Sequence, residues 1–134
     1  MGYSGTPLVK KLGLKSGLHA IFVNPPEHYA TTLGELPPGI EFGATLKGQF
    51  DFIQFFTTQR ADLEERLPEL KAALTKTGML WISWPKKAAK VPTDITEDIL
   101  REVILPLGLV DVKVIAVDNV WSGLKFVFRV ENRT

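Results

Sequence analysis

Three near-continuous apolar runs constrain the fold of this sequence most strongly: LHAIFVN (18–24), FDFIQFF (50–56) and MLWISW (79–84). Runs of this length with little polar alternation are typical of strands buried on both faces, as in a mainly parallel sheet. Between the second and third runs, four leucines recur at spacings of four, three and four: Leu63, Leu67, Leu70 and Leu74. This spacing predicts a helix with one apolar face. We therefore expect strands that alternate with helices, and helices on both faces of the sheet.

Prolines, glycines and capping residues predict where the first elements begin and end. Thr6 and Pro7 are expected to be the N-cap and the first position of a short helix that stops at Gly13. The prolines at 25–26 should end the first strand, because neither can donate to a sheet ladder. Residues 27–34 predict a second short helix that ends in glycine, and residues 40–46 predict a weaker strand.

The same residue types delimit the two later helices. Thr58 is the expected N-cap of the leucine-rich helix, Pro68 is expected to kink or divide it, and Gly78 is expected to end it. Asp94 and Glu97 fit a capping box for the next helix. Four apolar residues should form the buried face of that helix: Ile95, Ile99, Leu100 and Val103.

The last third of the chain changes character. Residues 109–118 predict a long strand, and residues 124–130 alternate between apolar and mostly polar side chains, as in a strand with one buried face. Asp118 and Asn119 offer a turn, and residues 121–123 are expected to form a compact turn of their own. The two strands are too close in sequence for a helical crossover, so we expect them to pair antiparallel.

Length, charge and cysteine content narrow the class of protein. A chain of 134 residues with 45% apolar residues suits one domain, residues 1–134, with a single core. The net charge of +1 provides no electrostatic argument for nucleic acid or an anionic membrane as a partner. With no cysteine, disulfides, thiolate zinc sites and cysteine nucleophiles are excluded. No apolar run approaches the roughly 18 residues of a membrane span, and no signal-peptide pattern is present, so we expect a cytoplasmic protein.

The order of these elements resembles the Rossmann-like fold of S-adenosylmethionine-dependent methyltransferases. The resemblance rests on KLGLKSGLHAIFVN as lead-in helix and first strand, on FDFIQFF with LPELKAALTKTGMLWISW as the central strand–helix–strand, and on LGLVDVKVIAVDNVWSGLKFVFR as the closing hairpin. It implies a single-domain α/β fold of three layers. The expected sheet is mainly parallel, with about six strands and a C-terminal antiparallel hairpin.

More closely, the sequence resembles a family of short bacterial proteins catalogued as a domain of unknown function. The residues that carry this resemblance are YSGTPLVKKLG, WPKK followed by PTDITEDILREV, and LPLGLVDVKVIAVDNVWSGLKFVFR. It implies the same single-domain fold and no particular activity.

One departure from the methyltransferase pattern bears on the cofactor. Such enzymes place a glycine-rich turn directly after the first strand, where the backbone must approach the cofactor closely. Here residues 24–28 read Asn-Pro-Pro-Glu-His, with no glycine. We therefore expect no cofactor. The interval between residues 24 and 50 also has room for only one further strand, so one strand–helix unit is expected to be missing.

The candidate binding residues follow from the expected fold. In open α/β sheets, ligands bind outside the carboxyl ends of the strands, an edge predicted to carry residues 24–28, 57–60 and 84–87. Five residues on this edge are the candidates for ligand binding: Asn24, His28, Trp84, Lys86 and Lys87. Trp84 and the two lysines could hold an aromatic or anionic group by stacking and charge. They also fit a packed strand-end tryptophan followed by solvated lysines, which is the commoner arrangement.

Acidic residues near these lysines argue against a phosphate site. Asp94, Glu97 and Asp98 are expected in the first turn of the helix after the lysines, where they would offset the helix dipole and repel an anion.

Metal binding and catalysis find little support in the sequence. His19 and His28 are the only histidines, they lack a recognisable ligand spacing, and His19 is expected to sit at the edge of the sheet. The serines lack the glycines of a nucleophile elbow. We expect neither a metal site nor a catalytic residue.

Three functions remain open. The first is a non-catalytic Rossmann-like module that binds a small ligand or a protein partner. The alternative is a degenerate S-adenosylmethionine-dependent methyltransferase, in which Glu41 or a neighbour would hold the cofactor ribose. A third is nucleic-acid binding through Trp84, Lys86, Lys87 and Lys90, and the overall charge argues against it.

Overall fold

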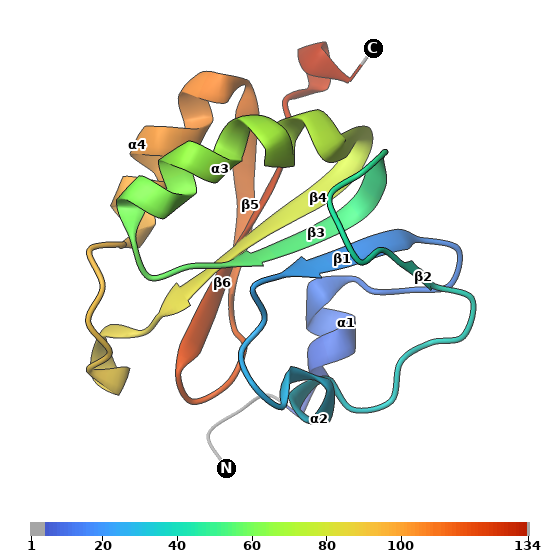
Figure 1. Ribbon diagram of the computed structural model, residues 1–134, viewed down its shortest axis with the longest axis horizontal. Helices are drawn as coiled ribbons and strands as arrows, with labels where there is room; N and C mark the ends of the chain where they lie inside the picture. The colour runs from blue at the N-terminus through green and yellow to red at the C-terminus, as the bar shows by residue number, and fades with distance from the viewer. Residues whose placement is uncertain (1–4, 134) are drawn as a thin grey trace.

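The computed structural model describes residues 5–133, which form one mixed six-stranded sheet with helices on both faces (Figure 1). The strands are β1 (His19–Val23), β2 (Glu41–Phe42), β3 (Phe50–Phe56), β4 (Leu74–Pro85), β5 (Leu109–Ala116) and β6 (Trp121–Phe128). Their order across the sheet is β2-β1-β3-β4-β6-β5. Strands β2, β1, β3 and β4 are parallel to one another, whereas β6 runs antiparallel to both β4 and β5. The predicted α/β architecture and its closing antiparallel hairpin are confirmed.

The helices form a layer on each face of the sheet (Figure 1). On one face lie α1 (Leu8–Leu12) and α2 (Tyr29–Leu33), and on the other lie α3 (Arg60–Ala73) and α4 (Glu97–Ile104). Short 3-10 turns follow at η1 (Lys87–Ala89), η2 (Leu105–Leu107) and η3 (Val130–Asn132). Within residues 5–133, no helix has the length and apolarity needed to cross a bilayer. Tyr3 and Ser4, which belong to the first family-like segment, lie outside the described residues.

The centre of the sheet is buried on both faces, as the apolar runs predicted. Along β3, Ile53 and Phe55 pack in the cluster under α3 and α4, while Phe52 and Phe56 pack in the cluster under α1 and α2. On β4, Trp81 is fully buried, and its Nε1 donates to a backbone oxygen of α1 over 3.0 Å. Alternate side chains of one strand therefore hold the two helical layers together.

Two expectations about the central helix were wrong. Pro68 does not divide it, since α3 runs through this residue to Ala73. Pro68 is exposed, and the buried leucines on the opposite face keep the helix packed despite one missing hydrogen bond. Gly78 does not end the helix but lies within β4. A Cβ at this position would come 2.9 Å from Leu74 Cδ1 and 3.0 Å from the Asp51 carbonyl oxygen, so glycine is required by close approach.

The predicted helix caps were also displaced. Gln59, not Thr58, is the N-cap of α3, and the Arg60 N–H donates to Asp94 Oδ1 over 2.7 Å. The Asp94 side chain therefore accepts a hydrogen bond from the first turn of α3 rather than from α4. The capping box predicted for α4 does not form. Thr96 caps α4 instead, because its Oγ1 accepts from the Ile99 N–H over 3.2 Å. The N-cap position of α1 is Pro7 rather than Thr6, one residue later than predicted.

The start of the last strand differs from the expectation as well. Trp121, Ser122 and Gly123 do not form a turn but are the first residues of β6. The turn lies just before them, where Asp118 Oδ1 accepts from the N–H groups of Val120 and Trp121, each over 2.8 Å. The hydrogen bonds to Asp118 fix the first residue of β6 beside the end of β4, where Trp121 pairs with Pro85.

The cap on α3 provides a stability test. We expect Asp94→Ala to lower the free energy of unfolding by about 1 kcal/mol, because the Arg60 N–H loses its acceptor. Asp94→Asn keeps an acceptor oxygen and should recover most of this loss. Urea denaturation followed by circular dichroism measures both changes. Thr58→Ala is the control, and a cost at Thr58 equal to that at Asp94 would contradict the assignment.

Candidate functional site

The carboxyl ends of β1, β3 and β4 meet at one edge of the sheet, where ligands bind in open α/β folds. The chain passes from β1 to β2 on one side and then to β3 on the other, so the strand order reverses between β1 and β3. Several hollows lie along this edge, among them one between β4 and α4 and one between β1 and β3. We call these two the β4–α4 pocket and the β1–β3 crevice.

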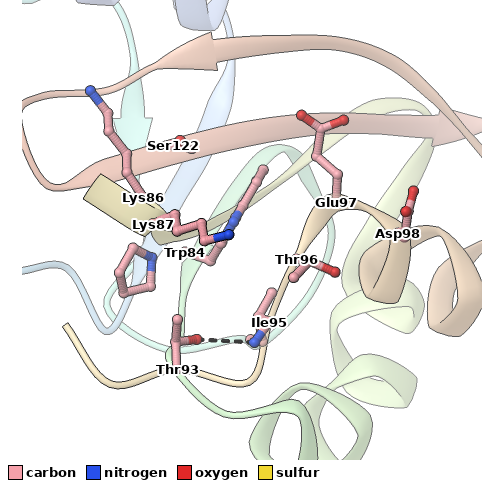
Figure 2. A pocket seen from close by; sticks show the side chains of 10 residues that line it. Trp84, Lys86, Lys87, Thr93, Ile95, Thr96, Glu97, Asp98 and Ser122 are labelled. Atoms are coloured by element: carbon pink, nitrogen blue, oxygen red, sulfur yellow. Dashed lines mark hydrogen bonds between the residues drawn. The ribbon is translucent and has the colours of Figure 1, made fainter. Parts of the chain in front are cut away.

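The β4–α4 pocket has a volume of about 610 Å³ and lies between the end of β4 and the start of α4. Six of the residues that line it carry the argument: Trp84, Lys86, Lys87, Thr96, Glu97 and Ser122. Figure 2 shows Trp84 between the strand end that carries the lysines and the helix start that carries Thr96 and Glu97. Three of the five predicted candidates therefore share one pocket.

Trp84 belongs to both the core and the pocket. It is 7% exposed, belongs to the apolar cluster that includes Ile95, and pairs in register with Ser122 of β6. The next residues are anchored through the backbone, since the Lys86 N–H donates to the Val120 carbonyl over 2.7 Å. The indole is thus fixed at the base of the pocket, while the lysine side chains lie at its rim.

Opposite charges line the two sides of this pocket. Within residues 5–133 neither Lys86 nor Lys87 makes an ion pair. On the helix side, Arg101 contacts Glu97 over 2.9 Å and Asp98 over 3.4 Å. Its hydrogen bonds to Asp111 and Glu97 raise the pKa of Arg101. The first turn of α4 is therefore less acidic than expected. Asp94 lies before the helix begins, and Arg101 offsets part of the negative charge of Glu97 and Asp98.

The β1–β3 crevice lies where the strand order reverses and has a volume of about 310 Å³. It is lined by Asn24 after β1, by residues 56–59 at the end of β3, and by Asp62 and Trp121. Thr57 Oγ1 donates to Asp62 Oδ2 over 2.9 Å and accepts from the Gln59 N–H over 3.2 Å. Polar side chains from one strand end and one helix therefore form one wall.

Asn24 takes the backbone conformation that a glycine would adopt most easily. Its φ is 57°, in the left-handed region, which asparagine tolerates better than most residues. The chain therefore achieves a tight turn after β1 without glycine. The next two residues, Pro25 and Pro26, have no N–H groups, so this part of the turn offers no backbone donors to a ligand.

Trp121 in the crevice was not among the predicted site residues. Its ring contacts Phe56 edge-on at 5.3 Å between centroids, and Phe56 in turn contacts Tyr29 at 4.9 Å. The sequence contained the necessary signal. A strand that pairs antiparallel with β4 must begin where β4 ends, so the first residue after the Asp118 turn lies at the ligand-binding edge.

A buried polar network ties α2 to the sheet beside the crevice. The Tyr29 hydroxyl donates to Gln54 Oε1 over 2.6 Å, and Gln54 Nε2 donates to Ser83 Oγ over 3.0 Å. Gln54 and Ser83 are fully buried, and burial raises the pKa of Tyr29. The phenol therefore stays protonated and donates to Gln54, a structural role that keeps the segment after residues 24–28 in place.

Other candidates lie apart from both hollows. His28 is exposed at the start of α2, with a φ of 63°, and lines neither of them. Glu41 pairs in register with His19 at the start of β1, whereas Asn24 follows the end of that strand. Five residues of extended chain separate these positions, roughly 16 Å, so Glu41 and Asn24 do not share a site.

The histidines and acids do not assemble into a metal centre in the described part of the chain. His19 lies on a strand flanked by two others, not at the sheet edge as expected. Its ring stacks on Phe50 at 4.3 Å, and its Nδ1 lies 2.6 Å from the Gln49 carbonyl oxygen. His19 is therefore part of the packing at the opposite end of the sheet.

Comparison with known proteins shows the fold. A SAM-dependent methyltransferase from Aquifex aeolicus is similar, with a TM-score of 0.59 and 16% identity over 89% of this chain and 86% of that chain. The ribosomal protein L11 methylase from Lactobacillus delbrueckii subsp. bulgaricus has a TM-score of 0.56 and 13% identity, over 91% and 75% of the two chains. The magnesium protoporphyrin IX methyltransferase from Synechocystis PCC 6803 has a TM-score of 0.58 and 12% identity, over 91% of this chain and 74% of that chain.

These likenesses establish a methyltransferase-like Rossmann fold, as the sequence resemblance implied. At such low identities they show the fold alone. No protein-family model matches the chain. No curated protein matches it either.

The strained turn after β1 can be tested by stability. We expect Asn24→Ala to lower the free energy of unfolding by about 1 kcal/mol, because alanine disfavours a left-handed φ. Asn24→Gly should stay within roughly 0.5 kcal/mol of the wild type, since glycine loses the strain but gains freedom when unfolded. Urea denaturation provides both values, with Glu27→Ala as a control in the same turn. Equal losses for alanine and glycine would assign the effect to the asparagine side chain instead.

Proposed function

We propose that the chain, acting as one domain over residues 1–134, is a non-catalytic Rossmann-like module that binds a small ligand in the β4–α4 pocket. The observation that carries this proposal is a nearly buried tryptophan at the base of an open pocket, with two lysines beside it that make no ion pair within residues 5–133. A protein partner at the same place is the second form of this proposal.

The lining of the pocket favours a flat ligand with polar groups of both kinds. The Trp84 indole offers a stacking surface, and Lys86 and Lys87 attract an anionic group. Glu97 and Asp98 on the opposite side accept hydrogen bonds from N–H or cationic groups. Nucleoside monophosphates and aromatic amino acids combine these features in one small molecule.

Binding without catalysis is supported by the residue types of this pocket. No histidine is among the residues that line it, and Glu97 is engaged by Arg101 over 2.9 Å. Histidine is the side chain that most often transfers protons in general acid–base catalysis. The residues of the pocket are therefore suited to binding a ligand rather than to catalysing its reaction.

The alternative function is a degenerate S-adenosylmethionine-dependent methyltransferase that uses the β1–β3 crevice. The fold of the chain and the glycine-like φ of Asn24 support it. The proline pair at 25–26 weighs against it, because these residues supply no N–H donors to a cofactor.

The proposal includes a cytoplasmic location and membership in the family of short bacterial proteins that the WPKK and WSGLKFVFR segments resemble. The resemblance carries no activity with it. The proposed binding function rests on the pocket alone.

Tryptophan fluorescence tests the β4–α4 pocket. Titration with nucleoside monophosphates and aromatic amino acids should produce a saturable change for at least one ligand, because Trp84 lies against it. We expect Trp84→Phe to remove most of this signal, and Lys86→Gln with Lys87→Gln to weaken binding about tenfold. Lys47→Gln with Lys90→Gln changes the net charge equally outside the pocket. If this control weakened binding as much, or if no ligand produced saturation, the proposal would fail.

Calorimetric titration with S-adenosylmethionine tests the alternative. If the cofactor binds in the crevice, Asn24→Val and Asp62→Asn should each weaken it severalfold, whereas Glu41→Gln should leave it unchanged. Transfer of a labelled methyl group would be required in addition to establish catalysis. Micromolar binding that depends on Glu41 would contradict the geometry of the crevice.

A further inference from the structure

A second charged surface, which shares no lining residue with the proposed ligand pocket, lies on the face formed by α1, β5 and β6. We call it the lysine face, and it comprises five lysines: Lys10, Lys11, Lys15, Lys113 and Lys125. Three of them, Lys10, Lys11 and Lys113, line one hollow of about 500 Å³. Lys15 and Lys113 both act electrostatically on Lys125. Residues from the two ends of the sequence are thus brought into one basic surface.

Acidic residues of the chain do not neutralise this surface. Within residues 5–133, none of the five lysines makes an ion pair. The ion pairs that do form join residues of α3 and α4, with Asp111 as one further partner. Asp111 pairs in register with Phe126, which packs in the cluster under those same helices. The net charge of +1 therefore conceals a separation of charge between the two faces of the sheet.

The lysines also repel one another. Partial burial lowers the pKa of Lys125, and the positive charges of Lys113 and Lys15 lower it further. A bound anion would remove this repulsion and favour the charged form. The lysine face is therefore suited to a negatively charged partner from outside the chain.

The residue types of the lysine face indicate which anion it suits. The five residues are all lysines, which act as point charges toward phosphate, whereas paired recognition of carboxylates favours arginine. Protein–protein interfaces are depleted of lysine at their centre and enriched in arginine and aromatic residues. Among residues 5–133, no aromatic residue lines the hollow, so this part of the chain offers no platform on which single-stranded bases could stack there.

We propose that the lysine face binds the phosphate backbone of a nucleic-acid duplex without reading its sequence. Backbone binding of this kind requires several cations on one face and little else. The proposal differs from the third function considered above, since it uses neither Trp84 nor the lysines at 86, 87 and 90. It is also independent of the β4–α4 pocket.

Fluorescence anisotropy with a short labelled duplex tests this proposal on the full chain. Affinity should fall steeply as salt rises from about 50 to about 200 mM, because counterions are released on binding. We expect Lys10→Gln with Lys113→Gln to weaken binding roughly tenfold at the lower salt and to reduce the salt slope by about 1.8, the value for two lost phosphate contacts. Both residues are exposed, and thermal denaturation checks that the variant is folded.

Lys47→Gln with Lys90→Gln is the matched control, since it removes the same charge from exposed positions elsewhere. An equal loss in this control would overturn the proposal, as would no duplex binding at about 50 mM salt. Tighter binding to single strands, to poly-glutamate or to anionic vesicles would also overturn it. The Lys10/Lys113 variant retains Trp84, Lys86 and Lys87, so a failure here leaves the ligand-binding proposal intact.

Discussion

Burial of the two central strands on both faces is the constraint on which the rest of the structure depends. Strands β3 and β4 carry large apolar side chains in both directions, and fully burying one such side chain stabilises a protein by about 1.5–3 kcal/mol. Neither face can be left to solvent, so each requires a helical layer. Helix α1 has only five residues, too few to be stable alone. It is held by the burial of Leu12 and by the hydrogen bond from Trp81 to the Leu12 carbonyl.

The same strands position the candidate sites. Because β1, β3 and β4 are parallel, their ends lie at one edge, and the antiparallel β6 begins at that edge too. Side chains there alternate between faces, so Ser122 faces the β4–α4 pocket while Trp121 faces the crevice. Asn24 and Trp84, both at strand ends, therefore line different hollows of the same edge.

Sequence patterns predicted the elements that depend on local or periodic signals. The apolar runs and the leucine spacing located β1, β3, α3 and β4, because burial on both faces leaves a continuous apolar pattern. The predictions that were wrong concern residues whose roles depend on tertiary contacts. Asp94 caps a helix that begins 34 residues earlier, and Gly78 is required by the Asp51 carbonyl of the neighbouring strand. The lysine face was not predicted, because its residues lie about a hundred positions apart and net charge averages over all faces.

The turn after β1 determines how any cofactor could be held in this version of the fold. Its conformation is not the obstacle, since Asn24 adopts the left-handed φ that a glycine would supply. The obstacle is the lack of N–H donors at Pro25 and Pro26, since polar ligand groups at such turns are bound by backbone amides. A ligand in the crevice must therefore depend on side chains, with Asp62 and Thr57 on one wall and the Trp121 ring available for stacking. Two of these three are already engaged with each other, so the crevice offers few free polar contacts. The β4–α4 pocket keeps two lysines without an ion pair in the described chain beside its tryptophan, and for that reason it is the stronger candidate for ligand binding.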